Sequence, residues 1–110
     1  MLIKKNDYLT TTTNHLAKSQ KEVILQSGVI NGLLQAAVGS LKIGQIIETH
    51  SHNTMNEFFY LISGKLQFSI EEVIYIVEPK DSIYVMKKKL HSLCALSDSE
   101  FFYFNLEDNT

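Results

Sequence analysis

The 110 residues suffice for one domain with a single core, and they leave no room for a second domain with its own core. Hydrophobic residues make up 45% of the chain and charged residues 20%, which excludes the composition of a disordered protein. A formal net charge of −2 argues against nucleic acid as a partner, because the positive charge needed to neutralise backbone phosphates is lacking.

The beginning of the chain has the weakest pattern, and we interpret residues 1–32 as an N-terminal arm or edge strand. Within it, residues 1–13 include the run Thr10–Thr13 and predict either an edge strand or a loose arm. The stretch Asn14–Leu25 is the best helical candidate in the chain, because Asn14 is a suitable N-cap residue.

The second region, residues 33–106, predicts an all-β sandwich or barrel. Short apolar runs alternate there with turn residues at intervals of roughly eight to ten residues. The strands are expected at Leu33–Val38, Gln45–His50, Glu57–Ile62, Lys65–Ile70, Val73–Val77, Ile83–Met86, His91–Leu96 and Glu100–Leu106.

Several of these strands are apolar on both faces, notably in the runs Phe58–Ile62 and Phe101–Phe104. A strand with one face in water should alternate between apolar and polar residues, so something other than solvent is expected to cover the outer side. A second subunit is the favoured cover, which predicts a homodimer. The alternative is that the N-terminal arm covers these strands.

The segment from Gly44 to Gly64 contains the residues that point to chemistry. Successive side chains alternate along an extended backbone, so His50 and His52, two residues apart, project from one face about 7 Å apart along the backbone. A turn over Asn53–Asn56 allows Glu57 to return beside them, and His91 on another strand can supply a third imidazole. Three imidazoles and one carboxylate suit Fe(II), Mn(II), Ni(II), Cu(II) or Zn(II).

This segment resembles the first motif of the cupin superfamily. The motif has a glycine, a His-X-His pair, a glutamate and a second glycine, and its spacing matches Gly44, His50, His52, Glu57 and Gly64. The resemblance covers Leu33–Leu106 and implies an antiparallel cupin β-barrel, a double-stranded β-helix of the jelly-roll type. It also implies one divalent transition-metal ion (Fe, Mn, Ni, Zn or Cu), held by His50, His52, Glu57 and His91 at the open end of the barrel.

The second cupin motif matches less completely. His91 supplies its histidine, and Asp81 stands where an aspartate commonly occurs. The places usually held by glycine, proline, glycine and asparagine are taken by Lys80, Met86, Lys88 and Ala95. The turn before His91 therefore departs from the family pattern, although the ligand itself is present.

Several other residues near the motif permit two interpretations. Glu48 lies on the same predicted face as His50. It is either a hydrogen-bond acceptor for a ligand imidazole or a solvated carboxylate at the edge of the sheet. The run Lys87–Lys89 either attracts an anionic substrate or is simply solvated. Phe59 and Leu61 should face the barrel interior and make the pocket beneath the metal apolar. His15 is isolated in a polar segment and receives no role.

Cysteine and lysine usage narrow the chemistry further. Cys94 is the only cysteine, so an intrachain disulfide and thiolate metal clusters are excluded. The ten basic residues are all lysine, and a guanidinium fork for carboxylates or phosphates is therefore lacking. No apolar run has the length of a signal peptide at the start or approaches about 18 residues later, so we expect a cytoplasmic protein without a membrane partner.

Two classes of function remain open at this point. In the first, the chain is a metal-dependent enzyme acting on a small molecule, of the dioxygenase, isomerase or lyase type, with Glu57 as a ligand rather than a free base. In the second, it is a non-catalytic cupin that binds or senses a small ligand. The enzyme is the favoured interpretation.

Overall fold

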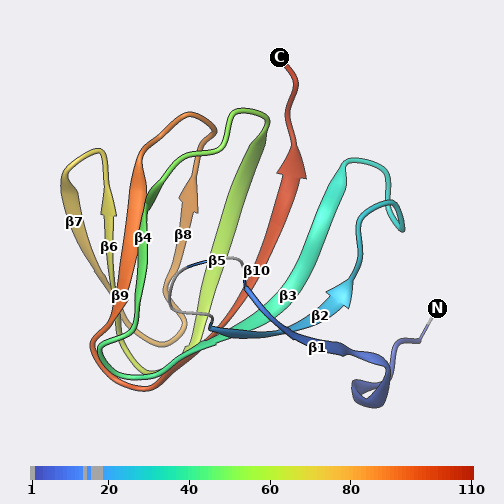
Figure 1. Ribbon diagram of the computed structural model, residues 1–110, viewed down its shortest axis with the longest axis horizontal. Coiled ribbons are helices and arrows are strands. Elements are labelled where there is room, and N and C mark those ends of the chain that lie inside the picture. Colours follow the sequence, from blue (N-terminus) through green and yellow to red (C-terminus); the bar gives the residue numbers. More distant parts are fainter. Residues whose placement is uncertain (1, 14, 16–18) are drawn as a thin grey trace.

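The computed structural model describes residues 2–13, 15 and 19–110, and this part of the chain is almost entirely β structure (Figure 1). One short 3-10 helix, η1, covers Lys5–Asp7. The strands are β1 (Leu9–Thr12), β2 (Gln20–Leu25), β3 (Leu33–Leu41), β4 (Ile46–His50), β5 (Met55–Ser63), β6 (Leu66–Ile70), β7 (Val73–Val77), β8 (Ser82–Val85), β9 (His91–Ala95) and β10 (Ser99–Glu107).

The strands form two antiparallel sheets, which confirms the all-β jelly-roll fold. The larger sheet has the order β1-β2-β3-β10-β5-β8, and the smaller sheet has the order β4-β9-β6-β7. In Figure 1 the larger sheet lies on the right and the smaller one on the left. The last strand of the chain, β10, lies inside the larger sheet, because it pairs with both β3 and β5.

All eight strands expected after residue 32 are present, with ends that shift by a few residues. The turns between them use the glycines of the motif. Gly64, between β5 and β6, has a φ of +93°, and a Cβ there would collide with the carbonyl of Asp98 and the Cα of Ser99. Only glycine fits this close approach of two backbone segments.

The helix predicted for Asn14–Leu25 is wrong over Gln20–Leu25, which form β2 between β1 and β3. Residues 14 and 16–18 of that prediction lie outside the described residues. The physical reason is tertiary: Val23 is 4% exposed and pairs with the fully buried Ala37 on the inner face of the larger sheet. Its β-branched side chain fits a pleated, half-buried surface better than a helix.

The core lies between the inner faces of the two sheets. Its most deeply buried large side chains are Leu41, Leu61, Leu66 and Phe68. Phe59 is also buried in this core cluster, so Phe59 and Leu61 face the interior as predicted. These apolar side chains fill the middle of the molecule and leave the polar residues of the motif at one end.

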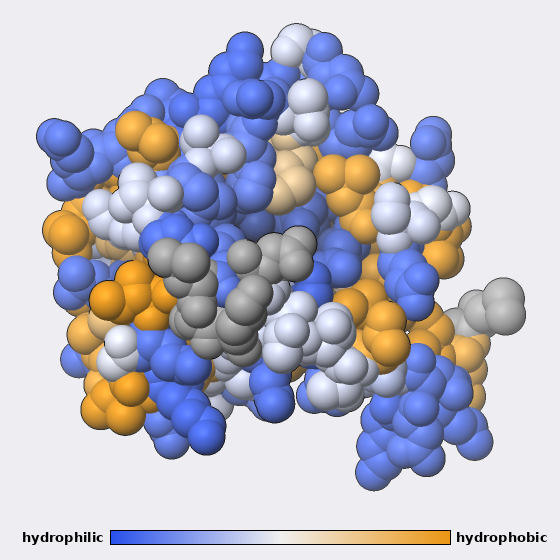
Figure 2. All heavy atoms as spheres, viewed as in Figure 1, coloured by the Kyte–Doolittle hydropathy of each residue, from blue (hydrophilic) through white to orange (hydrophobic). Residues whose placement is uncertain are grey.

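The outer surfaces retain many apolar side chains. On the larger sheet, Phe58, Phe102 and Phe104 are partly exposed, and the rings of Phe58 and Phe104 stack with centroids 5.0 Å apart. At the edge of the smaller sheet, β7 exposes about half of Val73, Ile74 and Ile76. In Figure 2 hydrophobic side chains gather on the left, over the smaller sheet.

The N-terminal strand β1 pairs with β2 and forms the edge of the larger sheet, on the far side of β3 from β5. It therefore continues the sheet sideways instead of covering the outer faces of β5 and β10. The described residues include no helix that is long and apolar enough to span a membrane.

Candidate metal centre

Three strands and one loop bring the four predicted side chains to the same end of the jelly roll. His50 is the last residue of β4, and His91, its partner in the ladder, is the first residue of β9. His52 lies in the loop that joins β4 to β5, and Glu57 lies on β5. The backbone N–H of Lys88 donates to the carbonyl of His52 at 2.6 Å, which ties the β8–β9 loop to the β4–β5 loop.

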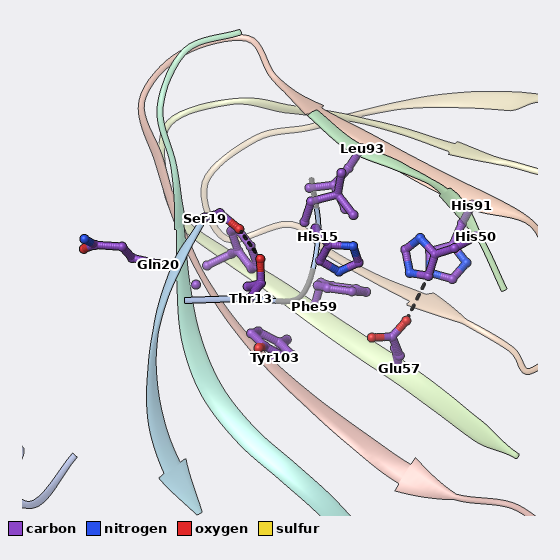
Figure 3. A pocket seen from close by; sticks show the side chains of 13 residues that line it. Thr13, His15, Ser19, Gln20, His50, Glu57, Phe59, His91, Leu93 and Tyr103 are labelled. Carbon is purple, nitrogen blue, oxygen red and sulfur yellow. Dashed lines mark hydrogen bonds and ion pairs between the residues drawn. The ribbon is translucent and has the colours of Figure 1, made fainter. Parts of the chain in front are cut away.

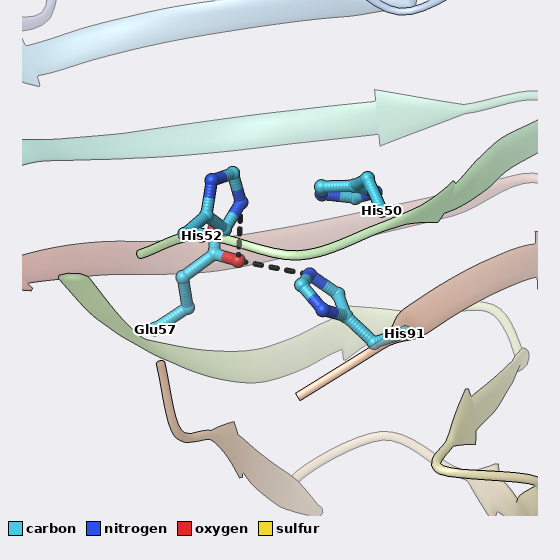
Figure 4. Close-up of side chains that lie close together, drawn as sticks. All are labelled: His50, His52, Glu57 and His91. Carbon is cyan, nitrogen blue, oxygen red and sulfur yellow. Dashed lines mark hydrogen bonds and ion pairs between the residues drawn. The ribbon is translucent and has the colours of Figure 1, made fainter. Parts of the chain in front are cut away.

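The four side chains converge closely, as Figure 4 shows. One donor atom from each of His50, His52, Glu57 and His91 lies within 4.8 Å of all the others. The Oε1 atom of Glu57 is 3.1 Å from Nε2 of His52 and 3.1 Å from Nε2 of His91. The structure therefore brings together every residue that the motif predicted for this site.

Backbone carbonyls fix the orientation of two of the imidazoles. Nδ1 of His50 is 2.7 Å from the carbonyl oxygen of Glu48, and Nδ1 of His91 is 2.9 Å from that of Lys89. A carbonyl oxygen only accepts hydrogen bonds, so each Nδ1 carries the proton and donates. Nε2 of each ring is thereby left to face the centre, which is the arrangement that outer hydrogen bonds give to metal-binding histidines.

The electrostatics of the site are dominated by the shared carboxylate. Burial alone would raise the pKa of Glu57, but the hydrogen bonds and charges of His52 and His91 outweigh it and lower the pKa to about 2. Burial also opposes a charge on His91, yet its hydrogen bond to Glu57 prevails and raises the pKa of His91. For His50, burial lowers the pKa, and the other imidazoles reinforce this shift.

The donor set fits a divalent transition metal. Three imidazole nitrogens and one ionised carboxylate oxygen are typical ligands for Fe, Mn, Ni, Cu or Zn ions. The second carboxylate oxygen of Glu57 is also supported, because the side-chain amide of Asn105, oriented with its nitrogen toward Glu57, donates to Oε2 at 3.1 Å. With Asn105 in this orientation, both oxygens of Glu57 are held by hydrogen bonds.

A cavity of about 50 Å³ lies beside the centre, room for a few water molecules (Figure 3). Its inner end is apolar and includes Phe59, Leu93 and Phe101. Its other walls carry hydrogen-bonding groups from opposite parts of the chain, among them Thr13, His15, Ser19 and Tyr103. A molecule bound there would meet the three groups His50, Glu57 and His91 at one end.

His15 is a residue of the site to which the sequence assigned no role. Its Nδ1 atom is 2.9 Å from Oε1 of Glu48, and its ring centroid is 4.9 Å from that of His50. The carboxylate of Glu48 therefore binds His15, while the backbone of Glu48 orients His50. No local pattern could have found this contact, because it joins residues 33 positions apart.

The lysine run beside the site divides into two environments. Lys87 is partly buried and pairs with Asp108, with Nζ 3.0 Å from Oδ1. It also donates to the carbonyl oxygen of Thr110. Lys88 and Lys89 are exposed. Lys87 therefore binds the C-terminal residues Asp108 and Thr110. The positive charge of this run that faces solvent belongs to Lys88 and Lys89.

A family model described as the cupin domain matches residues 37–106 of the chain. The chain belongs to the cupin family. The search of curated proteins found no match for this cupin.

Solved structures confirm the fold of this cupin. It resembles a predicted oxalate decarboxylase from Thermotoga maritima, with 17% identity and a TM-score of 0.83 over 97% of this chain and 99% of the other. It also resembles KdgF from Halomonas sp., with 13% identity and a TM-score of 0.81 over 100% and 94% of the two chains. The Fe(II) form of HppE is 10% identical, with a TM-score of 0.80 over 96% of this chain and 60% of the other.

Proposed function

We propose that this cupin is a metal-dependent enzyme that acts on a small molecule, of the dioxygenase, isomerase or lyase type. One divalent transition-metal ion would be held by His50, His52, Glu57 and His91. The observation that carries the proposal is that donor atoms of these four side chains lie within 4.8 Å of one another at the end of a cavity. Four protein ligands leave coordination positions open on a metal that prefers six, and open positions are what a substrate needs.

Each group has a defined task in this proposal. A bound ion supplies Lewis-acid chemistry toward a substrate oxygen. His50 and His91 present Nε2 because their Nδ1 atoms are engaged by backbone carbonyls, and Glu57 stays ionised because its pKa is about 2. Phe59 and Phe101 make the lining of the cavity partly apolar. Glu57 is a ligand here rather than a free base, since Oε1 faces the imidazole donors and Oε2 accepts from Asn105.

The structural neighbours are consistent with this proposal without carrying it. One is described as a predicted oxalate decarboxylase and another as an Fe(II) protein, which makes iron the first metal to test. At identities of 17% and 10% these likenesses show the fold alone. The proposal therefore depends on the side chains of this chain.

The metal content of purified protein tests the first half of the proposal. Elemental analysis should find about one transition-metal ion per chain, and His52→Ala should remove most of it, because the loss of one ligand breaks the chelate. His15→Ala is the matched control, since this histidine lies beside the cluster but is not one of its four donors, and it should keep the metal. Wild-type protein without metal after growth in metal-replete medium would contradict the proposal.

Turnover tests the second half. Small hydroxy, oxo and amino acids should be screened with the loaded protein by oxygen uptake and by NMR detection of products. Turnover by the wild type that is lost in His52→Ala supports an enzyme. Stoichiometric binding of a compound without turnover would instead place the chain among non-catalytic, ligand-binding cupins.

We also propose that the protein is a homodimer. Phe58, Phe102 and Phe104 form an aromatic patch on the outer face of the larger sheet, and Leu106 beside it is 45% exposed. The arm that was the alternative cover lies at the sheet edge in β1. A second copy of the same face is the simplest cover, because a two-fold interface uses one patch on both subunits.

A further inference from the structure

Lys21 is an unusual lysine in this chain. Among the described lysines, only Lys21 and Lys87 are half-buried, and Lys87 is paired with Asp108. The Nζ atom of Lys21 donates to Oε1 of Gln35 at 3.0 Å, and Gln35 is a neutral amide. No carboxylate of the described residues forms an ion pair with Lys21.

The position of Lys21 places this charge on the inner wall of the jelly roll. Lys21 pairs with Gly39 across β2 and β3, and the side chain of Val23, two residues further on the same face, is buried in the interior. Gly39 lines the cavity beside the metal centre, as does Tyr103 on the next strand, β10. Lys21 does not itself line this cavity, but its cross-strand neighbour Gly39 does.

Gln35 links this amine to the cavity. Its Oε1 atom accepts a second hydrogen bond from the hydroxyl of Tyr103 at 3.3 Å. Burial and the nearby Glu57 charge raise the pKa of Tyr103 to about 12, so the phenol keeps its proton and stays a donor. Lys21 and Tyr103 thus both donate to one amide oxygen, and the amide nitrogen of the same Gln35 side chain is a third donor.

Such a group lacks a negative charge. Removing an ammonium from water is costly unless a counter-charge accompanies it, and burial correspondingly lowers the pKa of Lys21. The only acceptor now shared by Lys21 and Tyr103 is one neutral oxygen. An anion that entered from the cavity would supply the missing charge and accept from several donors at once.

We propose that Lys21, Gln35 and Tyr103 form an anion-binding subsite for the carboxylate of a small organic acid whose other end binds at the metal centre. This inference rests on the proposed function and names its substrate class. One ammonium and two neutral donors match the single charge of a carboxylate. Because the chain has no arginine, a lysine supplies the positive charge here.

The test uses protein loaded with Co(II), whose visible absorption reports ligands that bind the ion. The probes are monohydroxamates of succinic, glutaric and adipic acid, each compared with the alkyl hydroxamate of the same length that ends in a methyl group. In the wild type, at least one chain length should bind about tenfold more tightly with the carboxylate than with the methyl end. The length that binds best measures the separation between the ion and the subsite.

Substitutions assign this preference to the subsite. Lys21→Met should abolish the carboxylate preference and leave the affinity of the methyl-ended probes unchanged. Tyr103→Phe, which keeps the ring, should reduce the preference and serves as the second variant if Lys21→Met does not fold. Lys65→Met is the matched control, because this exposed lysine follows the β5–β6 turn away from the cavity, and it should keep the full preference. An equal preference in wild type and Lys21→Met, or none in the wild type, overturns the proposal.

A metal-free arm separates this inference from the proposed function. Protein that takes up no cobalt would contradict the metal site, and the subsite is then tested with pentanoate and pentanamide, followed by NMR shifts of the Lys21 and Tyr103 amides. Saturable shifts with pentanoate, absent with pentanamide and in Lys21→Met, support the subsite on its own. Equal responses to the two probes overturn it.

Discussion

Both ring nitrogens of His91 lie within hydrogen-bonding distance of an oxygen acceptor. Nδ1 donates to the carbonyl of Lys89, and Nε2 lies 3.1 Å from the ionised carboxylate of Glu57. Both nitrogens therefore act as donors, which is the hydrogen-bonding pattern of the charged imidazolium. A charged His91 forms an ion pair with Glu57, and a metal ion that binds Nε2 would have to replace this proton.

This competition predicts opposite pH dependences for the two states. In metal-free protein the ionised carboxylate of Glu57 stabilises the fold at pH values above its unfolded pKa of 4.5. This contribution is lost as the pH falls toward its folded pKa of about 2. The charged imidazole of His91, whose pKa is raised, stabilises the fold at pH values below its unfolded pKa of 6.5. This contribution is lost as the pH rises through the folded pKa. The pair therefore contributes most between pH 4.5 and 6.5.

Metal-linked stability has the other sign, because bound imidazoles must be free of the proton on Nε2. The melting temperatures of loaded and chelator-treated protein should differ strongly near pH 7.5 and converge toward pH 5, because free histidine has a pKa of about 6.5. A gap that stayed constant over this range would mean that histidines do not hold the metal.

Glu57→Gln should act on both states. A neutral amide oxygen is a poorer ligand for a cation, so the gap between loaded and metal-free protein at neutral pH should shrink. In metal-free protein near pH 5.5, the variant should lose about 1 to 3 kcal/mol of unfolding free energy with the charged hydrogen bond to His91. Chemical denaturation with and without metal measures both effects. Equal stability of variant and wild type near pH 5.5 would refute the ion pair.

At the residue scale, the sequence predicted which four side chains meet but not what surrounds them. His50, His52 and Glu57 are close along the chain, so an extended backbone and one turn were enough to predict that they meet, although His52 lies in the β4–β5 loop and not on a strand. His15 and Lys21 reach the same end through pairing of the N-terminal strands with the larger sheet. That pairing depends on tertiary register, which no local pattern encodes.

At the scale of elements, the β5–β6 turn predicts a measurable difference between two glycines. Gly64 and Gly44 both have positive φ, but a Cβ would collide with backbone only at Gly64 and meet nothing within 4 Å at Gly44. Gly44→Ala should cost about 1 to 2 kcal/mol through backbone strain alone, and Gly64→Ala about 3 kcal/mol or more. Urea denaturation of the two variants makes the comparison. Equal losses would show that the turn opens to admit a methyl group.

The strands after residue 32 were predictable because each is bounded by turn residues and most are rich in β-branched or aromatic side chains, β3 and β9 being the exceptions. The segment that forms β2 was not predictable in this way, since its sequence alone is compatible with a helix. Only pairing with the neighbouring strand β3 makes it a strand. Val23 is held by its pairing with Ala37, a contact that exists only in the folded sheet. Propensity in this segment was overridden by burial on the inner face.

At the scale of the whole molecule, the homodimer predicted from the apolar strands leads to a direct experiment. Sedimentation at micromolar concentration should give a dimer, and Phe104→Glu should convert it to a monomer, because a charge would be buried in the aromatic patch. Ile74→Glu is the control, as this residue is 56% exposed on the other sheet, and it should remain dimeric. A monomeric wild type would refute the interface.

The exposed edge strand β7 has a consequence for how the protein behaves in concentrated solution. Its run Val73–Val77 is uncharged and free of proline, and such an edge can template aggregation with other molecules. The acidic residues Glu71, Glu72 and Glu78 flank this run and act as gatekeepers, since like charges keep two edges apart. The solubility of the protein therefore depends on a few carboxylates that have no part in the metal site.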